Sequence, residues 1–199
     1  MIGLFITFEG VEGAGKSTQI RLLQQRLSEQ GRQVCATREP GGDKVAEGVR
    51  ALLLSEEMDA RTELLLFLAA RAQNVAKVIR PQLDAGAIVL CDRFTDSSLA
   101  YQGYARGLGR DTVANLNIFA THDLTPHITF LLDLSPEVGL ARQQDRNRME
   151  AESLRFHTQV REGFLSEAKR DPKRFCVLDA TQSKETLQAL IWSHVSQYL

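Results

Sequence analysis

The sequence has few cysteines, few prolines and almost no net charge, and each shortage excludes a class of protein. Its 199 residues include three cysteines and five prolines. Cys35, Cys91 and Cys176 lie far apart, so they cannot form a complete disulfide framework, and they lack the Cys/His spacing of a zinc site. Each lies in a short apolar run, which favours buried, reduced thiols in strands. We therefore expect a protein of a reducing compartment, most simply the cytoplasm.

The charge and the N-terminal stretch argue against two kinds of partner. Lys plus Arg is 24 and Asp plus Glu is 25, giving a net charge of −1, without the basic field of a dedicated nucleic-acid binder. The N-terminal stretch MIGLFITFEG has no basic start, and its apolar part is far shorter than the roughly 18 residues that span a bilayer. We expect neither a nucleic-acid nor a membrane partner.

Short apolar runs alternate with longer stretches of helical periodicity, which predicts one α/β domain over residues 1–199. Strands that are apolar on both faces and separated by helices predict a parallel, doubly wound sheet covered on both sides. A helix should start at Lys16 and stop near Gly31, and Pro81 should interrupt a later helix. We expect strands at 2–8, 33–37, 87–91, 127–132 and 174–178, and further helices at 45–54, 62–79, 113–122, 137–143, 151–169 and 184–198.

A phosphate-binding loop is the strongest single motif. It reads GxxxxGK[ST], follows an apolar strand and opens an amphipathic helix. Glycines let several backbone N–H groups turn toward phosphate oxygens at the helix N-terminus. Lys16 would reach the β- and γ-phosphates, and Ser17 would offer its hydroxyl to Mg²⁺. The nucleoside triphosphate site is expected to comprise Gly10, Val11, Glu12, Gly13, Ala14, Gly15, Lys16, Ser17 and Thr18.

Three further segments are candidates for the rest of the site, since ligands of such sheets bind beyond the carboxyl ends of the strands. Arg38, in TREPGG, suits a second anion, or is part of a solvated turn. Asp92 and Arg93 suit Mg²⁺ and phosphates, or form a structural pair that caps a helix. The arginines of 142–150 suit a mobile lid over phosphates, although a run of charges is more often a solvated face.

The motifs together resemble thymidylate kinases of the bacterial kind. FEGVEGAGKST, TREPGG, FLAARAQ, VLCDRFTDSSLAYQG, LLDLSPEVGLAR and LDATQ follow the family's order from residue 5 to 182. TREPGG and DRFTDSSLAYQG are far more specific than the phosphate loop. The resemblance implies a P-loop nucleoside monophosphate kinase fold, with a five-stranded parallel sheet flanked by helices. It also implies transfer of the γ-phosphoryl group of ATP to dTMP, dependence on Mg²⁺ and a homodimer.

The resemblance further implies roles for individual residues. Lys16 and the loop amides hold the ATP phosphates, Ser17 and Asp92 serve Mg²⁺, and Arg38 and Arg93 clamp the dTMP phosphate. Phe67 stacks on the thymine and Arg71 bonds its O4 edge; their i, i+4 spacing places both on one helix face. The remaining assignments are Pro40 against the base, Ser98 and Gln102 at the pyrimidine edge, Tyr101 where a 2′-hydroxyl would intrude, Glu12 near the sugar 3′-hydroxyl or the metal, and Arg142 with Gln182 near adenine.

One division within the family concerns the catalytic arginines. The phosphate loop carries Glu12 and no arginine, so the chain resembles the members whose lid supplies Arg146 and Arg148. With Lys16, Arg93 and Glu12 these form the expected catalytic set. Two departures from the family pattern put local loop geometry in doubt. Tyr104 and Ala105 replace glycines, and Asp43 replaces a common threonine.

The predicted reaction needs no general base, because a phosphate monoester with a second pKa of about 6 is already mostly a dianion at neutral pH. Two other functions stay open. A deoxynucleoside kinase acting on a 5′-hydroxyl also carries a Glu-Pro pair, here Glu39-Pro40, although the neighbouring Arg38 argues for an acceptor already phosphorylated. A GTPase-type switch would need NKxD and DxxG motifs, which the chain lacks.

Overall fold

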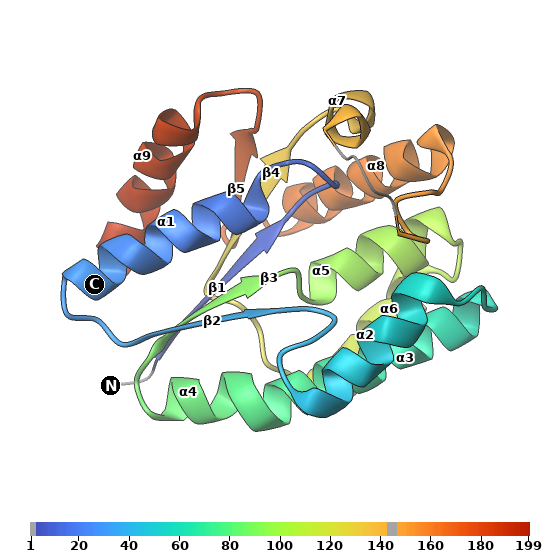
Figure 1. Ribbon diagram of the computed structural model, residues 1–199, viewed down its shortest axis with the longest axis horizontal. Coiled ribbons are helices and arrows are strands. Elements are labelled where there is room, and N and C mark those ends of the chain that lie inside the picture. Colours follow the sequence, from blue (N-terminus) through green and yellow to red (C-terminus); the bar gives the residue numbers. More distant parts are fainter. Residues whose placement is uncertain (1–2, 143–146) are drawn as a thin grey trace.

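Five parallel strands form one sheet in the computed structural model, which describes residues 3–142 and 147–199 (Figure 1). The strand order is β2-β3-β1-β4-β5, and each neighbouring pair is parallel. This arrangement confirms the predicted fold class. The strands are β1 (Leu4–Glu9), β2 (Val34–Arg38), β3 (Ile88–Asp92), β4 (Ile128–Asp133) and β5 (Phe175–Asp179).

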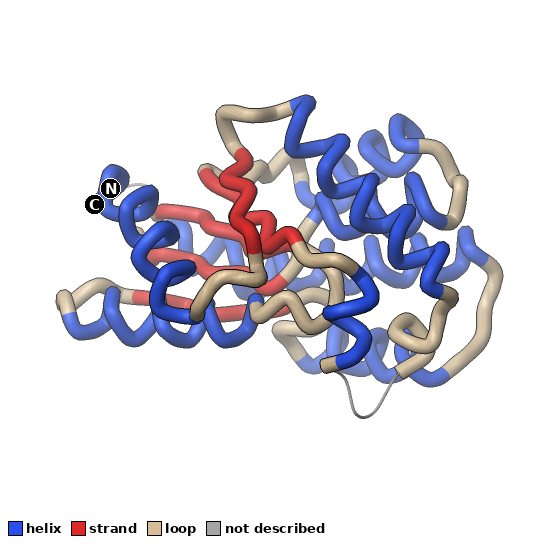
Figure 2. Tube along the Cα trace, turned by 90° about the horizontal axis from the view of Figure 1, so that it is seen from above, coloured by secondary structure: helices blue, strands red, loops and turns tan. Residues whose placement is uncertain are grey.

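Helices cover both faces of the sheet (Figures 1 and 2). Ile6 and Phe8 of β1 pack with Leu23 of α1, whereas Phe5 packs on the opposite face with Ile79, as the period of two along a strand requires. In the described ranges, no helix has the length and apolar character needed to cross a bilayer. The helical elements are α1 (Lys16–Glu29), α2 (Lys44–Ser55), α3 (Ala60–Asn74), η1 (Val75–Ile79), α4 (Arg80–Asp84), α5 (Thr95–Ser98), η2 (Leu99–Ala105), α6 (Arg110–Thr121), α7 (Pro136–Ala141), α8 (Leu154–Arg170), α9 (Lys184–Val195) and η3 (Ser196–Tyr198).

Two helical regions differ from expectation. Pro81 does not interrupt its helix, because a π-helical turn, η1, precedes it and Arg80 N–H donates to Val75 O five residues back. The wider turn accommodates a ring that clashes with a regular α-helix. The helical stretch α5–η2 was not predicted at all, since its sequence lacks apolar periodicity. Polar Asp96, Ser97 and Gln102 are buried there, so tertiary hydrogen bonds rather than an apolar stripe hold the segment.

The departures from the family pattern have structural explanations. Asp43 is the N-cap of α2, where its carboxylate accepts a hydrogen bond from Ala46 N–H at 2.9 Å, a role that threonine also fills. Tyr104 packs against Gly163 of α8, and its hydroxyl lies 2.9 Å from Glu167 Oε1. Tyr104 therefore fastens η2 to α8, and η2 carries several of the predicted binding residues.

Candidate functional site

Two adjoining cavities open at the carboxyl edge of the sheet. They share Glu12, Glu39, Arg50 and Arg93, which form the junction between them. The loop cavity, about 460 Å³, is lined in addition by Gly13, Gly15, Lys16, Ser17, Thr18, Arg38, Asp92 and Arg142. The aromatic cavity, about 100 Å³, is lined in addition by Pro40, Leu54, Phe67, Ser97, Ser98, Tyr101, Gln102, Asn147, Met149 and Glu150.

The phosphate loop lies close against neighbouring backbone. Gly10 and Gly13 have φ values of 135° and 71°, and a Cβ at either position would collide with the carbonyl oxygen of Leu132 or Gly139. Only glycine fits there, which explains the motif's spacing. Lys16 is buried, and its Nζ donates to Gly10 O and Val11 O, each at 3.1 Å. Burial and the nearby charge of Arg93 lower the pKa of Lys16.

Ser17 and Asp92, the two residues predicted to serve Mg²⁺, both line the loop cavity. Ser17 Oγ donates to Asp92 Oδ2 at 2.8 Å across the gap between α1 and β3. A hydroxyl and a carboxylate are hard oxygen ligands, which suits Mg²⁺ completed by phosphates and water. No group of three or more His, Cys, Asp or Glu side chains suited to a metal occurs among the described residues. Ser17 and Asp92 would thus supply two protein oxygens to a Mg²⁺ ion whose remaining ligands are phosphate and water oxygens.

Arg93 dominates the junction. It has φ 70°, unusual outside glycine, and its guanidinium pairs with Glu12 and donates to Gly10 O at 3.1 Å and Ser97 Oγ at 3.3 Å. Tyr101 donates to Glu12 Oε1 at 3.3 Å, beneath the Arg93 guanidinium. Burial alone would raise the pKa of Glu12, but Arg93 and Lys16 hold it below its ordinary value. The Arg93 guanidinium at the junction is therefore paired with an ionised carboxylate, that of Glu12.

Glu9 supports this junction from below. The carboxylate accepts hydrogen bonds from Phe94 N–H at 2.7 Å, Ser97 N–H at 3.3 Å and Ser97 Oγ at 2.6 Å, so it fixes the start of α5 directly after Arg93. Burial, reinforced by the charge of Asp96, raises the pKa of Glu9 to about 8. Glu9 was not predicted from the sequence as a site residue.

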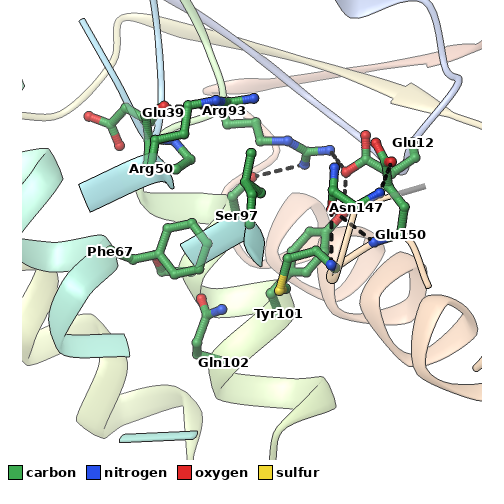
Figure 3. A pocket seen from close by; sticks show the side chains of 14 residues that line it. Glu12, Glu39, Arg50, Phe67, Arg93, Ser97, Tyr101, Gln102, Asn147 and Glu150 are labelled. Carbon is green, nitrogen blue, oxygen red and sulfur yellow. Dashed lines mark hydrogen bonds and ion pairs between the residues drawn. The ribbon is translucent and has the colours of Figure 1, made fainter. Parts of the chain in front are cut away.

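Residues of α2, α3, α5, η2 and the segment 147–150 line the aromatic cavity (Figure 3). Phe67 lies beside Gln102 in the cavity (Figure 3), which Ser98 and Tyr101 also line. Arg71, one helical turn after Phe67, does not line the cavity. Its guanidinium lies behind Ser98, which accepts from Nη1 at 2.8 Å.

Arg71 is held by a complete set of protein acceptors. Nε donates to Glu39 Oε2 at 2.7 Å, and the terminal nitrogens donate to Ser98, Asn117 and Phe94 O at 2.6–2.9 Å. Burial raises the pKa of Glu39, although Arg71 opposes the shift. A direct bond from Arg71 to a base stays a prediction, and the structure gives Arg71 a clear role in fixing Ser98.

Arg38 and Arg50 flank the loop cavity, but only Arg38 was predicted. The Arg38 side chain is 55% exposed and pairs with Glu47 at 3.0 Å. Arg50 Nη1 donates to Pro40 O at 2.9 Å, and Arg50 lines both cavities. Its place three residues after Glu47 on α2 was a usable signal, since such residues share a helix face.

Of the arginines predicted in the lid, the structure brings Arg142 to the phosphate loop but not Arg148. Arg142 Nη1 donates to Gly13 O at 2.8 Å, so it reaches the phosphate loop. Arg148 instead donates to Leu53 O at 2.9 Å and Glu63 Oε2 at 2.8 Å, and it lines neither cavity. The predicted catalytic Arg146 lies outside the described residues. Gln182 is exposed after β5 and lines neither cavity.

Comparisons with known proteins agree on one family. The family profile described as Thymidylate kinase matches residues 8–191. A thymidylate kinase of Geotalea uraniireducens is 50% identical over 98% of this chain and 97% of its own length. One from Bacillus velezensis is 51% identical, covering 93% and 91%. The crystal structure of thymidylate kinase from Ehrlichia chaffeensis superposes with a TM-score of 0.83 at 35% identity, covering 97% of this chain and 98% of that one.

Proposed function

The chain belongs to the thymidylate kinase family, and on that premise we propose that it transfers the γ-phosphoryl group of ATP to dTMP, giving dTDP and ADP. One observation carries the proposal. A cation-lined cavity on the phosphate loop joins a small aromatic cavity through a junction centred on Arg93. Two nucleotides can therefore meet end to end, with their phosphates at the junction and the acceptor base beside Phe67.

The chain's main catalytic task is to overcome repulsion between two polyanions, since the acceptor is already an anion. Lys16 exchanges the carbonyls of Gly10 and Val11 for phosphate oxygens of ATP. Arg38, Arg50 and Arg93 bind the acceptor phosphate. Such preorganised cations stabilise charge that spreads over the transferred phosphoryl group. Neither Glu39 nor Glu12 is needed as a base.

Ser17 and Asp92 would hold Mg²⁺, whose charge offsets that of the phosphates. In the aromatic cavity Phe67 stacks on thymine, with Pro40 against the base, while Ser98 and Gln102 read its edge. Tyr101 excludes a 2′-hydroxyl. Glu12 orients Arg93 and lies near the sugar.

We assign residues 142–150, of which 142 and 147–150 are described, the role of a lid within a single domain over 1–199. Arg142, with Gln182, is assigned to the adenine side. A catalytic role for Arg148 requires it to leave Glu63, its partner in the structure. Arg146 keeps its predicted role as a lid arginine.

A deoxynucleoside kinase is not favoured. That reaction needs a carboxylate free to accept the 5′-hydroxyl proton, and the carboxylate of the Glu-Pro pair is occupied. Glu39 accepts from Arg71 at 2.7 Å and from Asn74 at 3.3 Å. Taking up a proton would break these two contacts, because Arg71 and Asn74 hold both oxygens of the Glu39 carboxylate.

An acceptor screen tests the function. ADP release with ATP and Mg²⁺ should be rapid with dTMP, slower with dUMP and absent with thymidine. A single extra methyl group discriminates by about 10–200-fold, so dUMP should be a poor substrate rather than inert. Phosphorylation of thymidine without dTMP would instead establish the deoxynucleoside kinase.

We also propose a cytoplasmic homodimer. Phe119 and Ile118 of α6 and Leu65 of α3 are 82%, 52% and 59% exposed, on two helices that pack together. Exposed apolar side chains of this size favour an interface. Light scattering should give twice the chain mass of 22.2 kDa, and Phe119→Asp should give the monomer. A wild-type monomer would refute the proposal.

A further inference from the structure

A buried carboxylate behind the aromatic cavity has no part in the mechanism above. Glu63, on α3, is 1% exposed. Its Oε1 accepts from Gln102 Nε2 at 2.8 Å and Arg106 Nε at 3.2 Å. Its Oε2 accepts from Arg106 Nη2 at 3.0 Å and Arg148 Nη1 at 2.8 Å. These four donors use the full acceptor capacity of a carboxylate.

Glu63 is ionised in this setting. Burial opposes the charge, but the hydrogen bonds from Arg106, Gln102 and Arg148 hold the pKa of Glu63 below its ordinary value. An ionised carboxylate only accepts hydrogen bonds. Gln102 must therefore turn its NH₂ toward Glu63, and the amide cannot flip without setting oxygen against oxygen.

The consequence appears at the other end of the same amide. Gln102 is 1% exposed and lines the aromatic cavity, and its Oε1 accepts no hydrogen bond from the described residues. In Figure 3 this oxygen lies on the side of Phe67. Gln102 Oε1 is therefore a hydrogen-bond acceptor in a fixed position at the cavity wall. It suits a base that carries an N–H group on its pairing edge.

We propose that Glu63 is a positioning residue for base specificity, which holds the Gln102 amide so that the enzyme selects pyrimidines carrying N3–H. The inference rests on the proposed function and deepens it. Thymine and uracil have N3–H, whereas cytosine has a bare N3 acceptor. With cytosine in the cavity, its N3 lone pair would point at the Gln102 Oε1 atom, so two buried acceptors would be left without a donor.

Glu63→Gln tests the orientation at constant shape. The new carboxamide oxygen is drawn to the two charged donors on the Oε2 side, Arg106 Nη2 and Arg148 Nη1. The new NH₂ then lies on the Oε1 side, where it loses the weaker contact with Arg106 Nε and faces Gln102. Gln102 can flip to offer its oxygen to this NH₂ and so presents its own NH₂ to the cavity. The variant should lower the dTMP to dCMP ratio of kcat/KM by about tenfold or more, with the dTMP to dUMP ratio unchanged.

Glu152→Gln is the matched control. Glu152 pairs with the same guanidinium, at 2.6 Å from Arg106 Nη1, whereas it is Glu63 that accepts from the Gln102 amide. Removing this charge should leave both ratios within about twofold of wild type. Gln102→Leu provides a second variant in case Glu63→Gln does not fold, and it should lower the dTMP to dCMP ratio as well.

The outcomes separate the two proposals. If wild type does not phosphorylate dTMP, the proposed function itself fails. If wild type is active but Glu63→Gln loses activity equally on dTMP, dUMP and dCMP, Glu63 is only structural and the inference is overturned. An unchanged dTMP to dCMP ratio in Gln102→Leu overturns it too. A selective gain toward dCMP in Glu63→Gln, absent in Glu152→Gln, supports it.

Discussion

The two cavities hold their cations in opposite ways. Around the loop cavity Lys16 and Arg142 donate to backbone carbonyls, contacts that a phosphate oxygen can replace. Behind the aromatic cavity Arg71 is 1% exposed and bound to Glu39 and three further acceptors. A cation's contact with a neutral carbonyl is weaker than its contact with a carboxylate, where both partners are charged. Lys16 and Arg142 are therefore free to exchange their partners for a ligand, whereas Arg71 is fixed; Arg38 and Arg93, paired with Glu47 and Glu12, lie between these two cases.

The largest expected effect is on stability, at the buried Arg71 behind the aromatic cavity. Arg71→Met should lower the free energy of unfolding by about 3–5 kcal/mol, because it leaves Glu39 buried without its cation. Urea unfolding measures the change. Arg38→Met, which breaks an exposed pair, should change stability by less than about 1 kcal/mol. Equal losses in the two variants would show that the contrast is wrong.

In the loop cavity, removing a cation should lower the turnover rate rather than the stability. Lys16→Ala should lower kcat by about 10²–10³-fold, the usual effect of removing one preorganised donor to developing charge. The coupled ADP assay at saturating dTMP measures it. Lys184→Ala, an exposed lysine paired with Glu185, is the control. A kcat for Lys16→Ala within threefold of wild type would remove Lys16 from the transition state.

Arg50 tests the junction, where the two kinds of contact meet. Arg50→Ala should raise KM for dTMP by about tenfold, the value of one charge-assisted hydrogen bond, with a smaller change in KM for ATP. Initial rates at varied dTMP and ATP separate the two. Arg170→Ala, at a 59% exposed site, should change neither. A rise confined to ATP would place Arg50 with the donor nucleotide.

The last prediction concerns Glu9, beneath the junction, and appears only when the pH is varied. Its pKa is raised from 4.5 to about 8 on folding. Between those values the folded state binds more protons, so stability contributed by Glu9 is full below about pH 4.5 and is lost as pH rises toward 8. The slope cannot exceed about 1.4 kcal/mol per pH unit. Glu9→Gln should flatten it in urea unfolding between pH 5 and 8; an unaltered slope would show that Glu9 does not titrate there.

The fold and the phosphate loop could be predicted because both follow from local patterns. The strands lie within one or two residues of expectation, and the glycines of the loop mark positions that no Cβ could occupy. Helix α5–η2 could not be predicted, because its buried side chains are polar and their partners are distant in sequence. Ser97, for example, donates to Glu9, 88 positions away.

By itself, the sequence determined the sheet, the anion-binding loop and the set of residues that gather at one edge, since periodicity, glycine spacing and strand order are encoded locally. Only the tertiary structure decided which charges stay available. It paired Arg71 with Glu39 and Arg148 with Glu63, and it brought Arg50 to both cavities. The physical reason is that burial and hydrogen-bond partners set the behaviour of a charged group, and both arise between segments far apart in the chain.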